Sequence, residues 1–297
     1  MKGAMATTAR RKPASAHIAP HIALLPMAAT VLAGYVGAAL WTVYISLTAS
    51  RTFPSGRFIG LAQYRRLFDN ERWMLSLHNL AAYGAVFVLA CLAIGFLLAV
   101  CIDRQVSGEG VLRTVFLYPY AMSFVATGLV WQWLLAPGDG IDGLLGNIGL
   151  HIDWIVRQDL AIYAVALAGI WQASGLVMAL LLAGLRGVDP DIWKAARLDG
   201  IPAWRVYLQV VLPMLWPTVA TVLLLLLTAV VKLYDAVVAM TQGGPGTASE
   251  VPAKFIMDHL FLRSNVGLAS AGAVLLLAPV LALLAPYAYA RSRREAA

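Results

Sequence analysis

The sequence predicts an all-α, polytopic membrane protein with six transmembrane helices. Of its 297 residues, 61% are hydrophobic and only 12% are charged, which leaves too little polar surface to cover a soluble globule of this size. The long apolar runs lack the alternation of apolar and polar residues that is typical of an outer-membrane barrel. Because lipid offers the backbone no hydrogen-bond partners, each run is expected to be a helix.

Each apolar run is long enough to cross about 30 Å of hydrocarbon as a helix. The six runs cover residues 22–48, 79–102, 114–136, 160–184, 213–240 and 266–290. The first run follows a basic segment, as a signal peptide would, but it is longer than a typical signal-peptide core and five more runs follow it. The expected organisation is therefore a tail over residues 1–21, a six-helix domain over 22–290 and a tail over 291–297.

The basic residues between the runs indicate the orientation in the membrane. With the N-terminus inside, thirteen of the 22 Lys and Arg residues fall in inner segments, eight in outer segments and Lys232 within the fifth run. This bias favours two cytoplasmic termini. The net charge of +7 is mostly this topology signal, and we infer no nucleic-acid partner from it.

The chain shows no motif for an enzyme. It contains neither a phosphate-binding G-x-x-x-x-G-K-[ST] loop nor H-E-x-x-H, a metal-spaced Cys/His set or a convincing pair of nucleophile and base. We therefore expect no catalytic residue, metal or cofactor. Any work done by the protein must be driven by a partner.

The second inner loop, residues 185–213, carries the clearest helical signals outside the apolar runs. Asp189 can cap a helix whose first residue is Pro190 and which runs to about Leu198. Gly200 can then take the left-handed conformation that stops the helix. Pro202 opens a second short helix that ends at Pro213, where the fifth run begins.

The first of these two helices has two interpretations. Its surface is expected to present small residues beside charged ones, which would let another protein dock closely: Trp193, Lys194, Ala195, Ala196 and Arg197. Alternatively, Trp193 and Trp204 anchor an amphipathic loop in the membrane interface. The pattern by itself leaves both open.

Two stretches resemble permeases of ABC importers. In "WKAARLDGIPAWRVYLQVVLP", six residues fall on the Glu-Ala-Ala…Gly…Pro pattern of the cytoplasmic loop of these permeases: Ala195, Ala196, Asp199, Gly200, Leu212 and Pro213. The stretch "VKLYDAVVAMTQGGPG" resembles a segment of the permeases that import sugars and polyols. The chain is therefore identified as similar to carbohydrate importer permeases of the maltose-transporter type.

The resemblance implies partners and a docking site. A permease of this kind lies in the cell inner (plasma) membrane in contact with lipid, and works with a second permease subunit, two ATP-binding subunits and an extracytoplasmic sugar-binding protein. The loop 185–213 would be the cytoplasmic coupling-helix loop that docks on the ATPase, through Trp193, Lys194, Ala195, Ala196, Arg197, Asp199 and Gly200. Lys194 stands where the family usually has Glu, which reverses a charge on the docking surface.

Polar residues within the runs are the candidates for a substrate pathway, because they are costly in lipid. Lys232 and Asp235 are three residues apart on one expected helix face, which favours an ion pair that holds helices together. Alternatively, Asp235 accepts hydrogen bonds from sugar hydroxyls while Tyr234 stacks on the ring. Trp131, Gln132 and Gln172 are further candidates, either as interfacial and packing residues or as sugar contacts.

These observations predict the permease subunit of an ATP-driven importer of a neutral mono- or oligosaccharide. The neutral substrate is favoured because the two charges expected in the fifth run can cancel. Alternatives are an ion-coupled secondary carrier, an ABC importer of a polyol or glycerol phosphate, and a scaffold protein. No convincing internal repeat supports the carrier.

Overall fold

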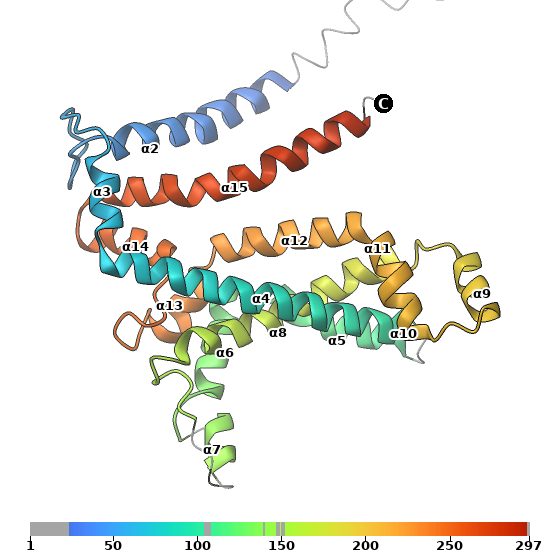
Figure 1. Ribbon diagram of the computed structural model, residues 1–297. Coiled ribbons are helices and arrows are strands. Elements are labelled where there is room, and N and C mark those ends of the chain that lie inside the picture. The colour runs from blue at the N-terminus through green and yellow to red at the C-terminus, as the bar shows by residue number, and fades with distance from the viewer. Residues whose placement is uncertain (1–23, 104–107, 139, 147–148, 150–151, 296–297) are drawn as a thin grey trace, which may run out of the picture.

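The computed structural model describes residues 24–103, 108–138, 140–146, 149 and 152–295, and these are mostly helical (Figure 1). Within these ranges, the only extended pairing is an isolated bridge between Thr48 and Phe58. The predicted all-α class is therefore confirmed.

The centre of the molecule is a parallel pair of long helices, α4 (Glu71–Asp103) and α8 (Ala161–Leu185), which form the most extensive helix–helix interface. Small residues let the two backbones approach. A Cβ on Gly95 would lie 2.5 Å from a methyl group of Val177, and one on Gly169 would lie 2.5 Å from the Tyr83 hydroxyl. This type of contact replaces the hydrophobic effect as the source of helix association in lipid.

The predicted third span is broken into two helices. α5 (Glu109–Ala121) and α6 (Phe124–Leu134) meet at an angle of 98°. Met122 is extended at the break, and the Ser123 side chain caps α6 by accepting a hydrogen bond from the backbone N–H of Ala126. The expectation of one continuous helix over 114–136 was wrong, because hydropathy does not report this local stop. The short helix α7 (Gly140–Gly146) follows α6.

The predicted fifth span is broken as well. The helical segment α10 (Ala203–Arg205), η2 (Val206–Val211) and α11 (Leu212–Met214) leads into α12 (Trp216–Val231) through a bend of 75°. α12 ends before Lys232, and α13 (Asp235–Thr241) begins after a three-residue break. The run 213–240 is therefore interrupted at the bend before Trp216 and again between α12 and α13, rather than forming one helix.

A second helix pair runs beside the central bundle (Figure 1). It consists of the helix Leu24–Ser46, which includes η1 (Leu32–Gly37) and α2 (Ala38–Ser46), and of α15 (Val266–Glu295). The connecting segments α3 (Ala62–Phe68), α14 (Pro252–Met257) and η3 (Asp258–Leu262) gather at one end of the molecule. At the opposite end lie α9 (Pro190–Leu198) and the C-terminal end of α15 (Figure 1).

Three helices in the described ranges are individually long and apolar enough to cross a membrane: Leu24–Ser46, α4 and α8. Counting each bent pair as one span raises the number to five, and α15 contributes a shorter apolar segment, Val266–Ala282. The predicted positions of the apolar segments agree with these helices. The count of six spans stays a prediction.

Candidate functional site

The inner loop folds locally as its sequence predicts. The Asp189 carboxylate accepts a hydrogen bond from the backbone N–H of Asp191 at 2.9 Å, and Pro190 opens α9. Gly200 has a φ of 68°, the left-handed conformation that ends the helix. The predicted cap, first residue and stop are all confirmed.

One face of α9 packs against the protein. Trp193 contacts the ring of Tyr207 on η2 at a centroid distance of 4.9 Å, and Ala196 is only 8% exposed. The expectation that Ala196 lies on the exposed surface was therefore wrong. Ala196 belongs to the same buried hydrophobic cluster as Val206 and Tyr207 of η2, which the spacing within α9 did not reveal.

The opposite face of α9 is open. It carries Lys194, Ala195, Arg197 and, past the helix end, Asp199 and Gly200. Leu198 is 88% exposed, an unusual position for a large aliphatic side chain beside charged residues. Leu198 was not among the predicted docking residues. Its position one helical turn after Lys194 and Ala195 could have indicated that it belongs to the same face.

The reversed charge of Lys194 is balanced within the same helix. Lys194 Nζ lies 2.7 Å from Asp191 Oδ1, and both side chains are largely exposed. Arg197 donates a hydrogen bond from Nε to the Trp193 carbonyl oxygen at 3.3 Å. The open face therefore presents a neutral Lys–Asp pair and one further cation beside Ala195 and Leu198.

A hollow of about 780 Å³ lies between α9, η2 and the end of α4. Its lining residues include Asp103, Tyr207, Lys194 and Arg197. Next to it, Trp204 is exposed and its ring lies 5.2 Å below the Arg205 guanidinium. An aromatic and a cationic residue on this surface also suit an interfacial anchor, so docking and anchoring can coexist along the loop.

The helices that carry or adjoin the pathway candidates meet at one junction, where α6 and α13 contact each other and α8. α6 and α13 form one of the most extensive interfaces, and a Cβ on Gly128 of α6 would lie 2.5 Å from the Ala239 side chain of α13. Tyr234 precedes α13 and is half-buried, whereas Asp235 and Lys232 are exposed. The junction therefore brings residues from the third, fourth and fifth spans together.

The expected ion pair between Lys232 and Asp235 does not form. Lys232 follows the last residue of α12 and Asp235 begins α13, so the break between the helices removes the shared face on which the expectation depended. Neither side chain takes part in an ion pair with any described residue.

Gln172 is buried and has a clear packing partner. Its Nε2 donates a hydrogen bond to the Met122 carbonyl oxygen at 2.9 Å, at the break between α5 and α6. Trp131 packs edge-on against Trp171, with ring centroids 6.0 Å apart, and Gln132 is half-buried beside it on α6. These contacts favour a structural role for Gln172, which holds a carbonyl group that the helix break leaves unpaired.

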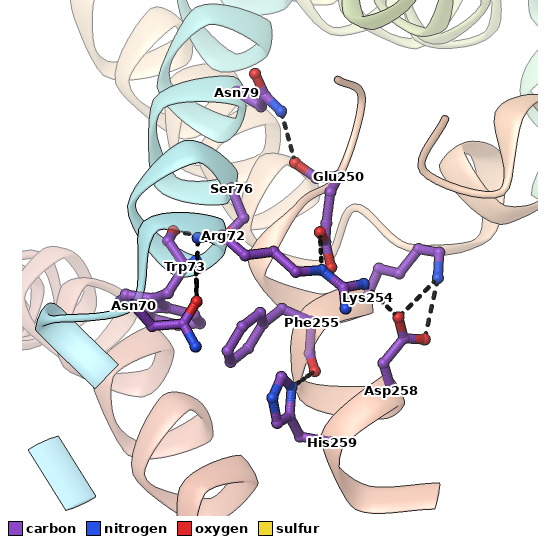
Figure 2. A network of polar contacts seen from close by, with 10 residues as sticks. All are labelled: Asn70, Arg72, Trp73, Ser76, Asn79, Glu250, Lys254, Phe255, Asp258 and His259. Carbon is purple, nitrogen blue, oxygen red and sulfur yellow. Dashed lines mark hydrogen bonds and ion pairs between the residues drawn. The ribbon is translucent and has the colours of Figure 1, made fainter. Parts of the chain in front are cut away.

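A charged cluster at the opposite end of the molecule was not predicted (Figure 2). Arg72, near the start of α4, contacts the Glu250 carboxylate through Nε and reaches Asp258 Oδ2 through Nη2 at 2.6 Å. Lys254 Nζ also binds Asp258, at 3.0 Å, and Asn79 donates to the Glu250 carbonyl oxygen at 2.9 Å. The spacing of Glu250, Lys254 and Asp258 at every fourth residue could have indicated the cluster, but not its partner on α4.

Comparison with known proteins gives consistent matches. Residues 92–294 match the family described as "Binding-protein-dependent transport system inner membrane component". A probable ABC transporter permease protein of Pyrococcus horikoshii is 33% identical over 277 residues, which cover 91% of this chain and 95% of that protein.

Two further relatives carry named substrates. A trehalose transport system permease protein of Mycobacterium tuberculosis is 32% identical over 271 residues, with 90% of this chain and 85% of the relative covered. An sn-glycerol-3-phosphate transport system permease protein of Agrobacterium fabrum is 28% identical over 273 residues, with 90% and 92% covered.

One solved structure shares the fold. A chain in the crystal structure of a bacterial ABC transporter involved in the import of the acidic polysaccharide alginate has a TM-score of 0.79. The alignment covers 94% of this chain and 96% of that chain at 19% identity, a level at which the likeness concerns the fold.

Proposed function

This chain belongs to the family of binding-protein-dependent inner-membrane transport components, and we propose that it is the permease subunit of an ATP-driven importer of a neutral mono- or oligosaccharide. It is a transport protein of the inner membrane rather than an enzyme. In the proposed complex it pairs with a second, similar permease to form half of the pathway. Two ATP-binding subunits and an extracytoplasmic sugar-binding protein complete the importer.

The observation that carries the proposal is the two-sided structure of α9. Trp193 and Ala196 fasten the helix to the protein, while Lys194, Ala195, Arg197 and Leu198 face outward. A small side chain between charged and apolar ones allows close approach of a second protein surface. We assign this open face, with Asp199 and Gly200 at its end, to the ATP-binding subunit.

The position of the last helix supports the proposed orientation. The C-terminal end of α15 lies at the same end of the molecule as α9 (Figure 1). If α9 meets a cytoplasmic ATPase, the C-terminus is cytoplasmic, as the basic residues predict. By the same bias, the N-terminus is proposed to be cytoplasmic too.

Replacement of Ala195 tests the docking face. In a complex purified with its ATP-binding subunits, Ala195→Trp should abolish ATPase association and substrate-stimulated hydrolysis, because the indole holds the two surfaces apart. Ala195→Ser is the matched control, since it keeps the side chain small. Both variants should melt like the native chain in detergent. Normal assembly and stimulated hydrolysis by Ala195→Trp would contradict the assignment.

The named relatives point to two substrate classes. The trehalose permease favours a neutral sugar, whereas the glycerol-3-phosphate permease favours a phosphate ester. Lys232 is exposed and forms no ion pair with a described residue. This supports the phosphate ester, because an unpaired cation can bind a phosphate group. Glycerol phosphate is therefore the second candidate.

Transport by the reconstituted importer distinguishes the two substrates. Proteoliposomes are given radiolabelled trehalose, maltose or glycerol 3-phosphate, with the native chain or Lys232→Met. The proposal expects uptake of a neutral sugar and little effect of Lys232→Met. Uptake of only the phosphate ester, lost in Lys232→Met, would replace the neutral sugar by the second candidate.

The ion-coupled carrier is not supported. Its coupling groups would have been Lys232 and Asp235, which do not share a helix face because α12 ends before Lys232 and α13 begins at Asp235, and the family is one of binding-protein-dependent transport. Counterflow in vesicles that contain the permease without ATP-binding subunits would reopen this alternative.

A further inference from the structure

The first inner loop is attached to the docking loop at both of its ends. The loop connects the last residue of α4, Asp103, to the first residue of α5, Glu109. Each of these two carboxylates contacts a residue of the segment that leads into or out of α9. In sequence these contacts span 77 and 104 residues, so neither arises from local structure.

The first attachment is an ion pair between α5 and the end of α8. Glu109 Oε1 lies 2.7 Å from Arg186 Nη2 and 2.8 Å from Arg113 Nη2. Arg186 follows the last residue of α8 and is separated by only two residues from Asp189, the cap of α9. The pKa of Arg186 is raised above its usual value, because Glu109 accepts a hydrogen bond from the guanidinium and Asp103 adds a smaller electrostatic effect.

The second attachment runs from α9 to α4 through Tyr207. The Tyr207 ring contacts Trp193 of α9, and its hydroxyl donates a hydrogen bond to Asp103 Oδ2 at 3.2 Å. Tyr207 is only 8% exposed, so this chain of contacts is held within the packed part of the loop. α9 is therefore connected to the inner end of α4 through Tyr207, and the segment that leads into α9 is connected to the inner end of α5 through Arg186.

The contact between α5 and α8 continues into the membrane. A Cβ on Gly175 of α8 would lie 1.8 Å from the Phe116 carbonyl oxygen of α5, so the two backbones touch. Farther along α8, Gln172 holds the Met122 carbonyl at the end of α5. Together with the Glu109–Arg186 ion pair at the inner end, these contacts hold α5 against α8 from the first residue of α5 to the break before α6.

From these contacts we propose that Glu109 and Asp103 are positioning residues that transmit movement of α9 to α5 and α4. This inference rests on the proposed function, in which the ATP-binding subunits move α9. When α9 moves, the Glu109–Arg186 pair carries α5 with α8, and the movement reaches the break between α5 and α6. The Tyr207–Asp103 contact carries the end of α4 in the same direction.

The test measures substrate transported per ATP hydrolysed in the complete importer. Glu109→Gln removes the charge of the pair at nearly constant size, and Tyr207→Phe removes the hydroxyl but keeps the ring against Trp193. Each should lower the transport-to-hydrolysis ratio by about fivefold, as expected for loss of a partly exposed ionic or hydrogen-bonded contact. The rate of ATP hydrolysis and the melting temperature should change little. If the two residues had a purely structural role, the variants would instead lower the melting temperature.

Arg113→Gln is the matched control, because it removes a cation within α5 and leaves the Glu109–Arg186 pair in place. Its ratio should stay native. If Glu109→Gln fails to assemble, Tyr207→Phe decides the question. A native ratio in Tyr207→Phe, or in both variants, would overturn the inference. Absence of ATP-driven transport in the native importer would instead refute the proposed function.

Discussion

Removal of Arg72 should destabilise the end of the protein that carries α14. Arg72 joins α4 to Glu250 and Asp258, and the Glu250 side chain is only 1% exposed (Figure 2). Arg72→Met would leave the Glu250 carboxylate buried without its cation, while Asp258 keeps Lys254 as a partner. The guanidinium also lies 5.9 Å from the centroid of the Phe255 ring, a smaller contact that is lost as well.

The magnitude follows from the burial of the two partners. Loss of one partner from a buried ion pair costs about 3–5 kcal/mol, because the remaining charge is uncompensated. The Arg72 side chain is 23% exposed, so water can partly reach the site, and we expect the lower end of that range, about 3 kcal/mol. At roughly 2–4 °C per kcal/mol for a chain of this size, the melting temperature should fall by about 6–12 °C.

Thermal unfolding of the purified chain in detergent, followed by tryptophan fluorescence, measures this effect. Arg72→Met combined with Glu250→Gln should recover most of the loss, because the uncharged amide no longer needs a cation. Glu71→Gln, at the exposed neighbouring position, is the control and should melt like the native chain. If Arg72→Met melts within about 1 °C of the native chain, or if the double variant is no more stable than the single one, the reasoning from burial is refuted.

Three further predictions concern other parts of the chain. Gln172→Leu should lower stability by about 1–3 kcal/mol, because the Met122 carbonyl loses its donor; a melt unchanged from native would exclude this brace. Ala196→Trp should reduce the yield of folded protein rather than block docking alone, because Ala196 is buried in the hydrophobic core; a folded variant that only fails to bind the ATPase would instead assign Ala196 to the docking face. Burial holds the pKa of His259 below its ordinary value of 6.5, so protons favour the unfolded state. Stability should therefore fall as the pH drops below about 6.5 and continue to fall until the folded pKa is reached, and His259→Phe should remove this slope between about pH 7 and 5; an equal slope in both proteins would contradict it.

Local features of the inner loop were predictable because they depend on neighbouring residues alone. Asp189, Pro190 and Gly200 act through the backbone within a few positions, and each takes the conformation that its chemistry favours. The face that α9 buries was not predictable, since its short helix has apolar residues on more than one side. In the folded chain Trp193 contacts Tyr207, Ala196 is buried and Leu198 is exposed.

The sequence by itself determined the class of the protein, its apolar segments and its resemblance to importer permeases, because hydropathy and short motifs act along the chain. Only the tertiary structure decided where the apolar runs break into separate helices. The hydropathy of a run is the same whether it forms one helix or two, so hydropathy cannot locate the break. The same holds for the contacts of Arg72 with Glu250 and of Glu109 with Arg186, which are 178 and 77 residues apart. Such pairs form only when packing brings two helix ends together, and no local property of either residue specifies that neighbour.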